Sequence, residues 1–298
     1  MSMRIAVLGA GAIGSLIAAK LVDSGYEVHV HARGEHGAAL AVNGLSVSGV
    51  WDKKIKPDQW TVSLDEVGIH DSLKNRFDQV IITCKSKDTE YLAKIAKDLT
   101  NGPVMSLQNG LGNKEVIQRY KHENYAVAVT TNAVKRPSPG SIEWVGKGNL
   151  VIGGPKGTEF VDQLNSLEAI YQEDLSSILW NKLLINIAIN PIAAICGVKN
   201  GALLEEPLIS QAESTMLEGA KIARLIGIDI GSDLELIQNL HHVLTTTSDN
   251  TCSMLVDVKL GKETEIDSLC GQIVERGEQL GTPTPLNSIL LAQIKSLR

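Results

Sequence analysis

Cysteine is scarce in this chain of 298 residues, and its few cysteines fall at scattered positions. No two of them have the close spacing typical of a zinc site, and nothing indicates a disulfide framework. The sequence shows none of the usual metal-ligand spacings, so no metal is expected. No signal peptide precedes the first predicted strand, which favours reduced thiols in a cytoplasmic protein. The cysteines are Cys84, Cys196, Cys252 and Cys270.

An excess of positive charge is also missing. The chain has 28 Lys and Arg against 34 Asp and Glu, a formal net charge of −6, with no block of like charges. A nucleic-acid-binding protein usually has a basic face, so no nucleic-acid partner is expected. Hydrophobic residues make up 43% and charged residues 21%, which is near the average for globular proteins and excludes a disordered or low-complexity chain.

The chain has little that resembles a membrane span. Its longest apolar stretch, residues 183–198, is interrupted by Asn186, Asn190 and Pro191. A bilayer-spanning helix needs about 20 predominantly apolar residues, so this stretch is too short and too polar. We therefore expect no membrane partner. A small-molecule substrate fits these features, and a monomer or a homodimer is compatible with them.

Short apolar runs alternate with helical patterns in the first half. Continuous Val, Ile and Leu runs between helices indicate a parallel sheet that is covered on both faces. Three later runs, separated by proline and glycine turns, predict hairpin-connected strands at one edge of this sheet. The buried strands are predicted at 4–8, 27–31, 79–84 and 103–107, the first helix at 12–23, and the hairpin strands at 126–131, 141–145 and 149–152.

A glycine-rich turn follows the first predicted strand and opens the first predicted helix. In such a turn the first glycine permits the tight bend, the second lets a pyrophosphate approach the backbone, and the third lets helix and strand pack closely. The phosphates then face the unpaired N–H groups and the positive end of the helix dipole. A turn that serves packing alone is the alternative. The predicted cofactor-binding residues are Gly9, Ala10, Gly11, Ala12, Ile13 and Gly14.

The end of the second predicted strand indicates which dinucleotide binds. NAD sites usually have an acidic residue there, which accepts hydrogen bonds from the ribose. Here the strand ends with Arg33, and the first acid is Glu35. Arg33 is suited to a 2′-phosphate, through charge-assisted hydrogen bonds worth about 1.5–3 kcal/mol. The sequence therefore predicts NADP, and a solvated surface arginine is the alternative.

Lys85 and Asn109 each come just after the carboxyl end of a predicted strand. Open α/β sheets bind ligands at that edge. Lys85 would place a cation near the cofactor, and Asn109 an amide near the nicotinamide. Both are equally compatible with ordinary loop structure.

After residue 173 the strand signal disappears, and helical spacing continues to the end. Helices are predicted at 177–195, 206–226, 233–245, 252–260 and 264–280. The predicted fold is therefore an α/β N-terminal Rossmann-type dinucleotide-binding domain, residues 1–173, followed by an all-helical C-terminal substrate and catalytic domain, residues 174–298.

A polar stripe marks the first helix of the second half. Lys182, Asn186 and Asn190 recur every four residues on an otherwise apolar helix, so they share one face. Buried polar side chains need hydrogen-bond partners, which neighbouring helix ends or a small anionic substrate would supply.

A second polar stretch contains Ser253 and Glu265. On one continuous helix these residues would lie about 18 Å apart, too far to share a small ligand. Gly261 is a plausible helix terminator, and Thr264 with Asp267 resembles a capping box that starts a new helix. Ser253 and Glu265 would then both lie near helix N-termini, where they can converge.

Together these motifs resemble the ketopantoate reductase (2-dehydropantoate 2-reductase) family over essentially the whole chain. That family reduces 2-dehydropantoate to pantoate with NADPH, on the route to pantothenate and coenzyme A. Cys270 departs from the family pattern, which often has Asn there. The matching pieces are 9–14, Arg33, 84–85, 108–110, 180–183, 186–191, 253–257 and 264–267.

The resemblance implies a role for each candidate residue. Lys182 would be the general acid at the keto oxygen, and Glu265 would bind the product hydroxyl and help to hold Lys182. Such a pair fits the chemistry, because hydride delivery to a ketone builds negative charge on oxygen. Asn109, Asn186, Asn190 and Ser253 would bind the substrate; Arg33, Lys85, Asn109 and Glu265 would join the glycine turn at the NADPH.

Two alternatives remain at this level. A paralogue with the same chemistry would reduce a different 2-keto acid, because the sequence does not reveal a pocket for the substrate side chain. A regulator that senses NADP without turnover is compatible with the fold, since a fold does not fix a function. A regulator would have no use for the pair Lys182 and Glu265.

Overall fold

The structure is a computed structural model that describes residues 2–121 and 123–297. Contacts divide the chain into two compact units. The first unit runs to Gln108 and resumes at Asn113–Leu175. The second unit begins at Ser176 and also includes the short segment Asn109–Gly112. The α/β first unit and the helical second unit confirm the predicted fold class.

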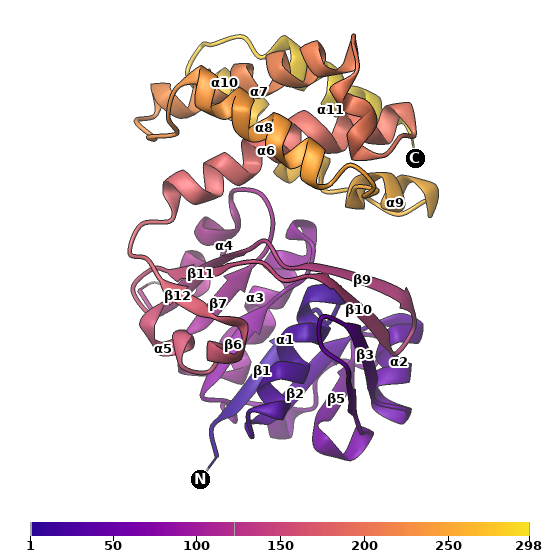
Figure 1. The fold of residues 1–298 in the computed structure, drawn as a ribbon. Coiled ribbons are helices and arrows are strands. Elements are labelled where there is room, and N and C mark those ends of the chain that lie inside the picture. Colours follow the sequence, from indigo (N-terminus) through magenta and orange to yellow (C-terminus); the bar gives the residue numbers. More distant parts are fainter. Residues whose placement is uncertain (1, 122, 298) are drawn as a thin grey trace. The chain divides into compact units, whose positions relative to one another are not determined.

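An eight-stranded sheet forms the centre of the first unit, in the order β12-β11-β8-β7-β6-β1-β2-β5 (Figure 1). Its neighbours pair in parallel except for β11 and β8, which are antiparallel. The strands are β1 Arg4–Leu8, β2 Glu27–Ala32, β5 Thr61–Leu64, β6 Gln79–Ile82, β7 Val104–Leu107, β8 Tyr125–Thr130, β11 Leu150–Gly153 and β12 Ala169–Tyr171.

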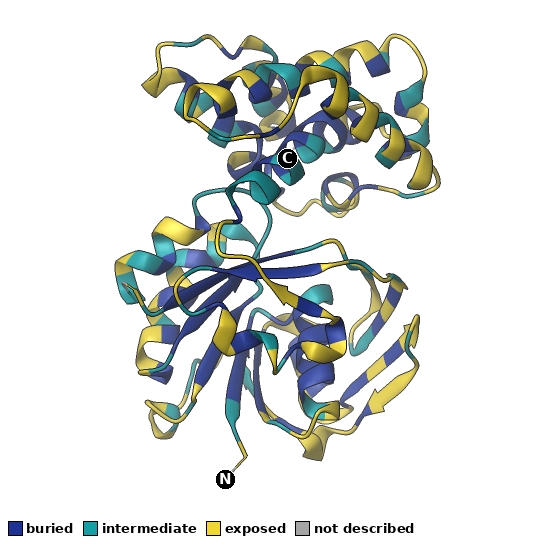
Figure 2. Cartoon of the chain, turned by 60° about the vertical axis from the view of Figure 1, so that its left-hand side comes forward, coloured by how far each residue is buried: buried dark blue, intermediate teal, exposed yellow. Residues whose placement is uncertain are grey.

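The central strands of this sheet are buried, as their dark blue colour shows in Figure 2. Every residue of β6 and β7 is buried. Burial on both faces requires helices on both sides, and it explains why these strands read as uninterrupted Val, Ile and Leu runs. The helices of the first unit are α1 Ala12–Asp23, α2 Gly34–Val42, α3 Thr89–Leu99, α4 Asn113–Lys121 and α5 Thr158–Val161.

The predicted row of hairpin strands at the sheet edge is wrong in one respect. β8 and β11 do pair in the main sheet, but β10 (Ser141–Gly146) belongs to a second sheet with the order β4-β3-β10-β9. Burial alternates along β10, with Ile142 and Trp144 inward, so the strand covers a core with one face only. The other strands are β3 Leu45–Gly49, β4 Lys53–Ile55 and β9 Ala133–Ser138.

The second sheet packs on α1, the helix that follows the glycine turn. Trp144 of β10 lies 5.3 Å from the ammonium of Lys20, and Trp51 lies 3.7 Å from it, both measured to a ring centroid. Both rings thus offer their π-systems to this nearly buried lysine. The second sheet and the loop that carries Trp51 thereby hold α1 in place.

The second unit is built around α6 (Ser176–Cys196), which packs against α7, α9 and α11. At 21 residues with mean hydropathy 1.5, α6 has the length and composition of a membrane span, so the prediction that this stretch is too short is wrong. Its apolar side chains form the core of the unit, and 56% of the apolar 18-residue segment within this helix is buried. The other helices are α7 Leu208–Leu225, α8 Asp233–Thr246, α9 Ser253–Lys259, α10 Cys270–Gln279 and α11 Pro285–Ser296.

Candidate active site

The glycine turn lies between β1 and α1, as its sequence predicts. The first hydrogen bond of α1 runs from Ser15 N–H to the Gly11 carbonyl at 3.0 Å. The three N–H groups before it, those of Ala12, Ile13 and Gly14, therefore have no helical carbonyl to bind. Such a helix end is suited to an anion.

Each glycine of the turn has a distinct steric role. Gly9 has φ +86°, and a Cβ there would lie 2.8 Å from the Cys84 backbone. A Cβ on Gly14 would collide with the Thr83 hydroxyl, which packs between α1 and the sheet. Beside Gly11 the space is open, with only the Gly9 carbonyl oxygen 4.0 Å from an added Cβ. This cradle fits a pyrophosphate group, because the open space beside Gly11 lets a phosphate come close to the backbone there.

Arg33 is the N-cap residue of α2, and its side chain is 58% exposed. Its guanidinium donates to Asp88 Oδ2 at 3.0 Å. The next residue, Gly34, donates its N–H to Glu66 Oε1 at 2.7 Å. Sequence reasoning missed both carboxylates, since each is distant along the chain from Arg33. Arg33 is thus oriented by an acid and still accessible to a ligand.

Lys85 lies three residues after the end of β6 and is half-buried. It precedes a short 3-10 helix, Ser86–Asp88, and its carbonyl accepts from Asp88 N–H at 2.9 Å. Gln108 fixes the preceding residue, donating to the Cys84 carbonyl at 3.1 Å. Gln108 therefore organises the loop that carries Lys85, a role that the sequence did not suggest.

The predicted polar stripe is present on α6. Lys182, Asn186 and Asn190 are half-buried, whereas Leu183 and Ile187 on the same helix are buried. Four residues of α-helix advance by about 6 Å, so the stripe spans about 12 Å along one face of α6. That length suits a small molecule with several polar groups.

Lys182 lies at one end of the stripe, close enough to Glu265 for their charges to interact. Burial lowers the pKa of the Lys182 ammonium from 10.5 to about 8, and the Glu265 carboxylate acts in the opposite direction. Glu265 Oε2 also accepts from Asn109 Nδ2 at 3.2 Å. Asn109, Lys182 and Glu265 thus meet in the second unit, although they come from three separate parts of the chain.

Ser253 lies at the other end of the stripe. It is the first residue of α9 and is exposed. The preceding residue, Cys252, caps this helix by accepting from Leu255 N–H at 3.4 Å, and its thiol donates to the Asn190 carbonyl at 3.6 Å. The Cys252 side chain therefore ties the start of α9, and with it Ser253, to the Asn190 end of α6.

The predicted capping box at Thr264 is wrong. The helix expected at 264–280 is instead a short 3-10 helix, Ile266–Ser268, followed by α10, with Glu265 as the residue before the first turn. The Thr264 hydroxyl is buried and has no hydrogen-bond partner among the described residues. Gly261 has φ +59°, as expected for a residue that ends a helix, so the chain does turn between Ser253 and Glu265.

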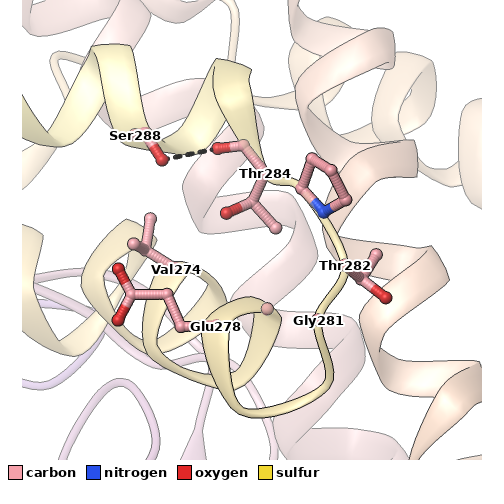
Figure 3. A pocket seen from close by; sticks show the side chains of 8 residues that line it. Val274, Glu278, Gly281, Thr282, Thr284 and Ser288 are labelled. Atoms are coloured by element: carbon pink, nitrogen blue, oxygen red, sulfur yellow. Dashed lines mark hydrogen bonds between the residues drawn. The ribbon is translucent and has the colours of Figure 1, made fainter.

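A separate hollow of about 290 Å³ lies between α10 and α11 (Figure 3). Glu278, Thr282 and Thr284 contribute to its wall, and Ser288 Oγ donates to the Thr284 carbonyl at 2.7 Å. None of the predicted site residues is part of its lining. The candidate active site is therefore the Lys182 cluster rather than this hollow.

Comparison with known families matches both halves of the chain. The family model described as ketopantoate reductase PanE/ApbA matches residues 5–157. The model described as ketopantoate reductase PanE/ApbA, C terminal, matches residues 174–298. The two models cover the unit with the glycine turn and the unit with Lys182 respectively.

Several relatives match almost from end to end. The chain is 37% identical to the 2-dehydropantoate 2-reductase of Pyrococcus horikoshii, across 99% of this chain and 97% of the relative. It is 32% identical to the enzyme of the same name from Archaeoglobus fulgidus, with the same coverage. The crystal structure of a PanE/ApbA family ketopantoate reductase from Ralstonia eutropha superposes with a TM-score of 0.89 at 28% identity, across 99% of this chain and 98% of that one. The chain belongs to the ketopantoate reductase family.

Proposed function

We propose that this protein reduces 2-dehydropantoate to (R)-pantoate with NADPH, a step in the formation of pantothenate and coenzyme A. The observation that carries the proposal is the meeting of Lys182, Glu265 and Asn109 in the second unit. The names of the relatives from Pyrococcus horikoshii and Archaeoglobus fulgidus point to the same reaction. The first unit adds the glycine turn with its anion-binding helix end.

Each residue at the site has a defined task in this proposal. Bound nicotinamide supplies the hydride to the keto carbon. Lys182 Nζ donates its proton to the keto oxygen, on which negative charge builds. Glu265 favours the charged form of Lys182 and accepts from the hydroxyl of the product. Asn109, Asn186, Asn190 and Ser253 donate hydrogen bonds that orient the substrate.

The cofactor is assigned to residues of the first unit. The N–H groups of Ala12, Ile13 and Gly14 would bind the pyrophosphate, with Gly9, Ala10 and Gly11 shaping the turn. Arg33 would bind the 2′-phosphate, and Lys85 a cofactor phosphate or ribose. In the same proposal Asn109 and Glu265 face the nicotinamide. The reaction takes place in the cytoplasm, with the protein as a monomer or a homodimer.

A kinetic assay with several substrates tests this function. NADPH oxidation would be followed by the loss of its absorbance with 2-dehydropantoate and smaller 2-keto acids, and repeated with NADH. The NADH series is needed because D-mandelate dehydrogenase has the same fold in complex with NADH, with a TM-score of 0.90 at 22% identity. Rapid turnover of 2-dehydropantoate is expected, with a preference for NADPH.

The other outcomes separate the alternatives. Turnover of another keto acid alone would identify a paralogue that keeps the Lys182 chemistry. Tight NADPH binding without turnover of any keto acid would favour a regulator instead. A preference for NADH would refute the assignment of Arg33 and leave the reaction type intact.

Replacing Arg33 and replacing Asp88 should change the preference for NADPH over NADH in opposite directions. Replacing Arg33 with Ala should weaken NADPH binding about tenfold to a hundredfold, because a charge-assisted contact with the 2′-phosphate is lost. Asp88→Asn should tighten NADPH binding, because Asp88 competes with that phosphate for the guanidinium. NADH binding should change little in both variants. Fluorescence titration with each cofactor measures the four dissociation constants.

The exposed Arg76 gives a matched control, since its replacement by Ala removes the same charge elsewhere on the first unit. Arg76→Ala should leave both cofactor affinities unchanged. An Arg33→Ala variant with an unaltered ratio of NADPH to NADH affinity would show that Arg33 is only a surface arginine paired with Asp88.

A further inference from the structure

Two buried polar side chains next to the glycine turn have no task in the proposed reaction. Ser15 is completely buried on α1, and His36 is 5% exposed on α2. Ser15 Oγ lies 3.0 Å from His36 Nε2 and donates to the Ala10 carbonyl at 3.4 Å. The other ring nitrogen, His36 Nδ1, accepts from Gly140 N–H at 3.0 Å. A single chain of hydrogen bonds thus runs from the turn before β10 to the glycine turn.

The direction of every hydrogen bond in this chain is determined. A backbone N–H can only donate, so Nδ1 of His36 must be the unprotonated nitrogen. The proton of the neutral ring is therefore on Nε2, which donates to Ser15 Oγ. The Ser15 hydroxyl is then left to donate to the Ala10 carbonyl. Burial lowers the pKa of His36 to about 4, with a smaller contribution from Arg136, so the ring is neutral near pH 7.

The last hydrogen bond of this series, from Ser15 to the Ala10 carbonyl, holds the peptide group between Ala10 and Gly11. The carbonyl of this peptide accepts from Ser15, and its N–H donates to the Gly9 carbonyl at 2.7 Å. Thr83 fixes the preceding peptide, donating to the Gly9 carbonyl at 2.9 Å. Both peptides are therefore held in place immediately before the open cradle at Gly11.

We propose that Ser15 and His36 are positioning residues for the pyrophosphate of the dinucleotide. His36 orients the Ser15 hydroxyl, and Ser15 fixes the Ala10–Gly11 peptide so that the N–H groups that follow it point at the phosphates. This inference rests on the proposed dinucleotide site. It adds two residues that would contact neither the cofactor nor the substrate.

Binding measurements on Ser15→Ala test the proposal, with two ligands that differ in the pyrophosphate. NADPH contains it, whereas adenosine 2′-monophosphate retains the adenosine and the 2′-phosphate without it. Ser15→Ala should weaken NADPH binding about threefold to tenfold, as expected for the loss of one buried hydrogen bond. The affinity for adenosine 2′-monophosphate should not change. The KM for NADPH should rise by the same factor with kcat nearly constant. Calorimetric titration gives both dissociation constants.

A double-mutant cycle tests whether His36 acts through Ser15 in this series of hydrogen bonds. His36→Leu should also weaken NADPH binding. The double variant should bind NADPH as tightly as Ser15→Ala does, because His36 acts through Ser15. Thr100→Val is the matched control. It removes a buried hydroxyl that donates to the Phe77 carbonyl at 2.7 Å in the same unit. Thr100→Val should lower stability about as much as Ser15→Ala does, and it should leave NADPH affinity unchanged.

Unchanged NADPH affinity in Ser15→Ala would overturn the inference. Equal weakening of the binding of both ligands would also overturn it, because it would indicate a general loosening of the first unit. Additive effects of Ser15→Ala and His36→Leu on NADPH affinity would show that His36 does not act through Ser15, and would refute its proposed role. If the unaltered protein bound no NADPH, the dinucleotide site itself would be refuted, and this inference with it.

Discussion

Replacing Lys182 with Ala is expected to lower kcat for keto acid reduction by about 10² to 10⁴, the usual contribution of a general acid. The variant loses both the proton donor and the positive charge beside the developing alkoxide. NADPH affinity should be nearly unchanged, because the glycine turn and Arg33 belong to the first unit. Steady-state kinetics with 2-dehydropantoate, together with fluorescence titration of NADPH, separates the two effects.

Lys221 is the matched control for Lys182. It is an exposed lysine on α7 of the same unit, so Lys221→Ala removes the same charge from a position on the surface. Turnover by Lys221→Ala should equal that of the unaltered protein. If Lys182→Ala also retained full turnover, Lys182 would have no part in proton transfer, and another group would have to supply the acid.

The secondary structure could be predicted wherever the spacing of apolar residues along the sequence follows directly from which faces of a strand or helix are buried. Strands covered on both faces read as continuous apolar runs, and the helical spacing after residue 173 extends over the whole second unit. The assignment of β10 to the main sheet failed because an apolar strand pattern does not specify its partner. β10 pairs with β3, about 95 residues earlier in the chain, and only packing over α1 decides this.

The candidate site was predictable to the extent that it follows local spacing. The four-residue period places Lys182, Asn186 and Asn190 on one face of α6, which the structure confirms. The proximity of Lys182 to Glu265 came from the family resemblance, because the two residues are far apart in the chain. Thr264 shows the limit of local motifs, since its capping-box pattern matches a helix start that does not form.

Residues that act across the fold left no signal in the sequence. Ser15 and His36 are ordinary helix residues until β10 brings the Gly140 N–H to the ring of His36. Asp88 and Arg33 are likewise separated by 55 positions. Their partners are fixed by the order of strands in the two sheets, which no local pattern encodes.

The pH dependence of the reaction should report the environment of Lys182. Burial lowers the pKa of its ammonium to about 8, within the range that kinetics can measure. Reduction requires the protonated amine, so kcat/KM for the keto acid should be constant below this pH and fall about tenfold per pH unit above it. Oxidation of the hydroxy acid requires the neutral amine, so its kcat/KM should instead rise up to about pH 8 and then level off.

Glu265→Gln should move this pH profile. The Glu265 carboxylate raises the pKa of Lys182 against the effect of burial, so its neutralisation leaves burial unopposed and the pKa falls further. The decline in reduction should therefore begin at a lower pH. The loss of a charge-assisted contact to the reacting oxygen should also lower kcat about tenfold to a hundredfold.

Glu278→Gln removes a negative charge from an exposed position of α10 and should leave the profile unchanged. A Glu265→Gln profile that coincides with that of the unaltered protein would mean that the decline does not report Lys182. A shift to higher pH would contradict the charge interaction itself, because removing a nearby carboxylate can only destabilise the ammonium. The direction of the shift therefore tests the pairing of Lys182 with Glu265 separately from the size of the loss in kcat.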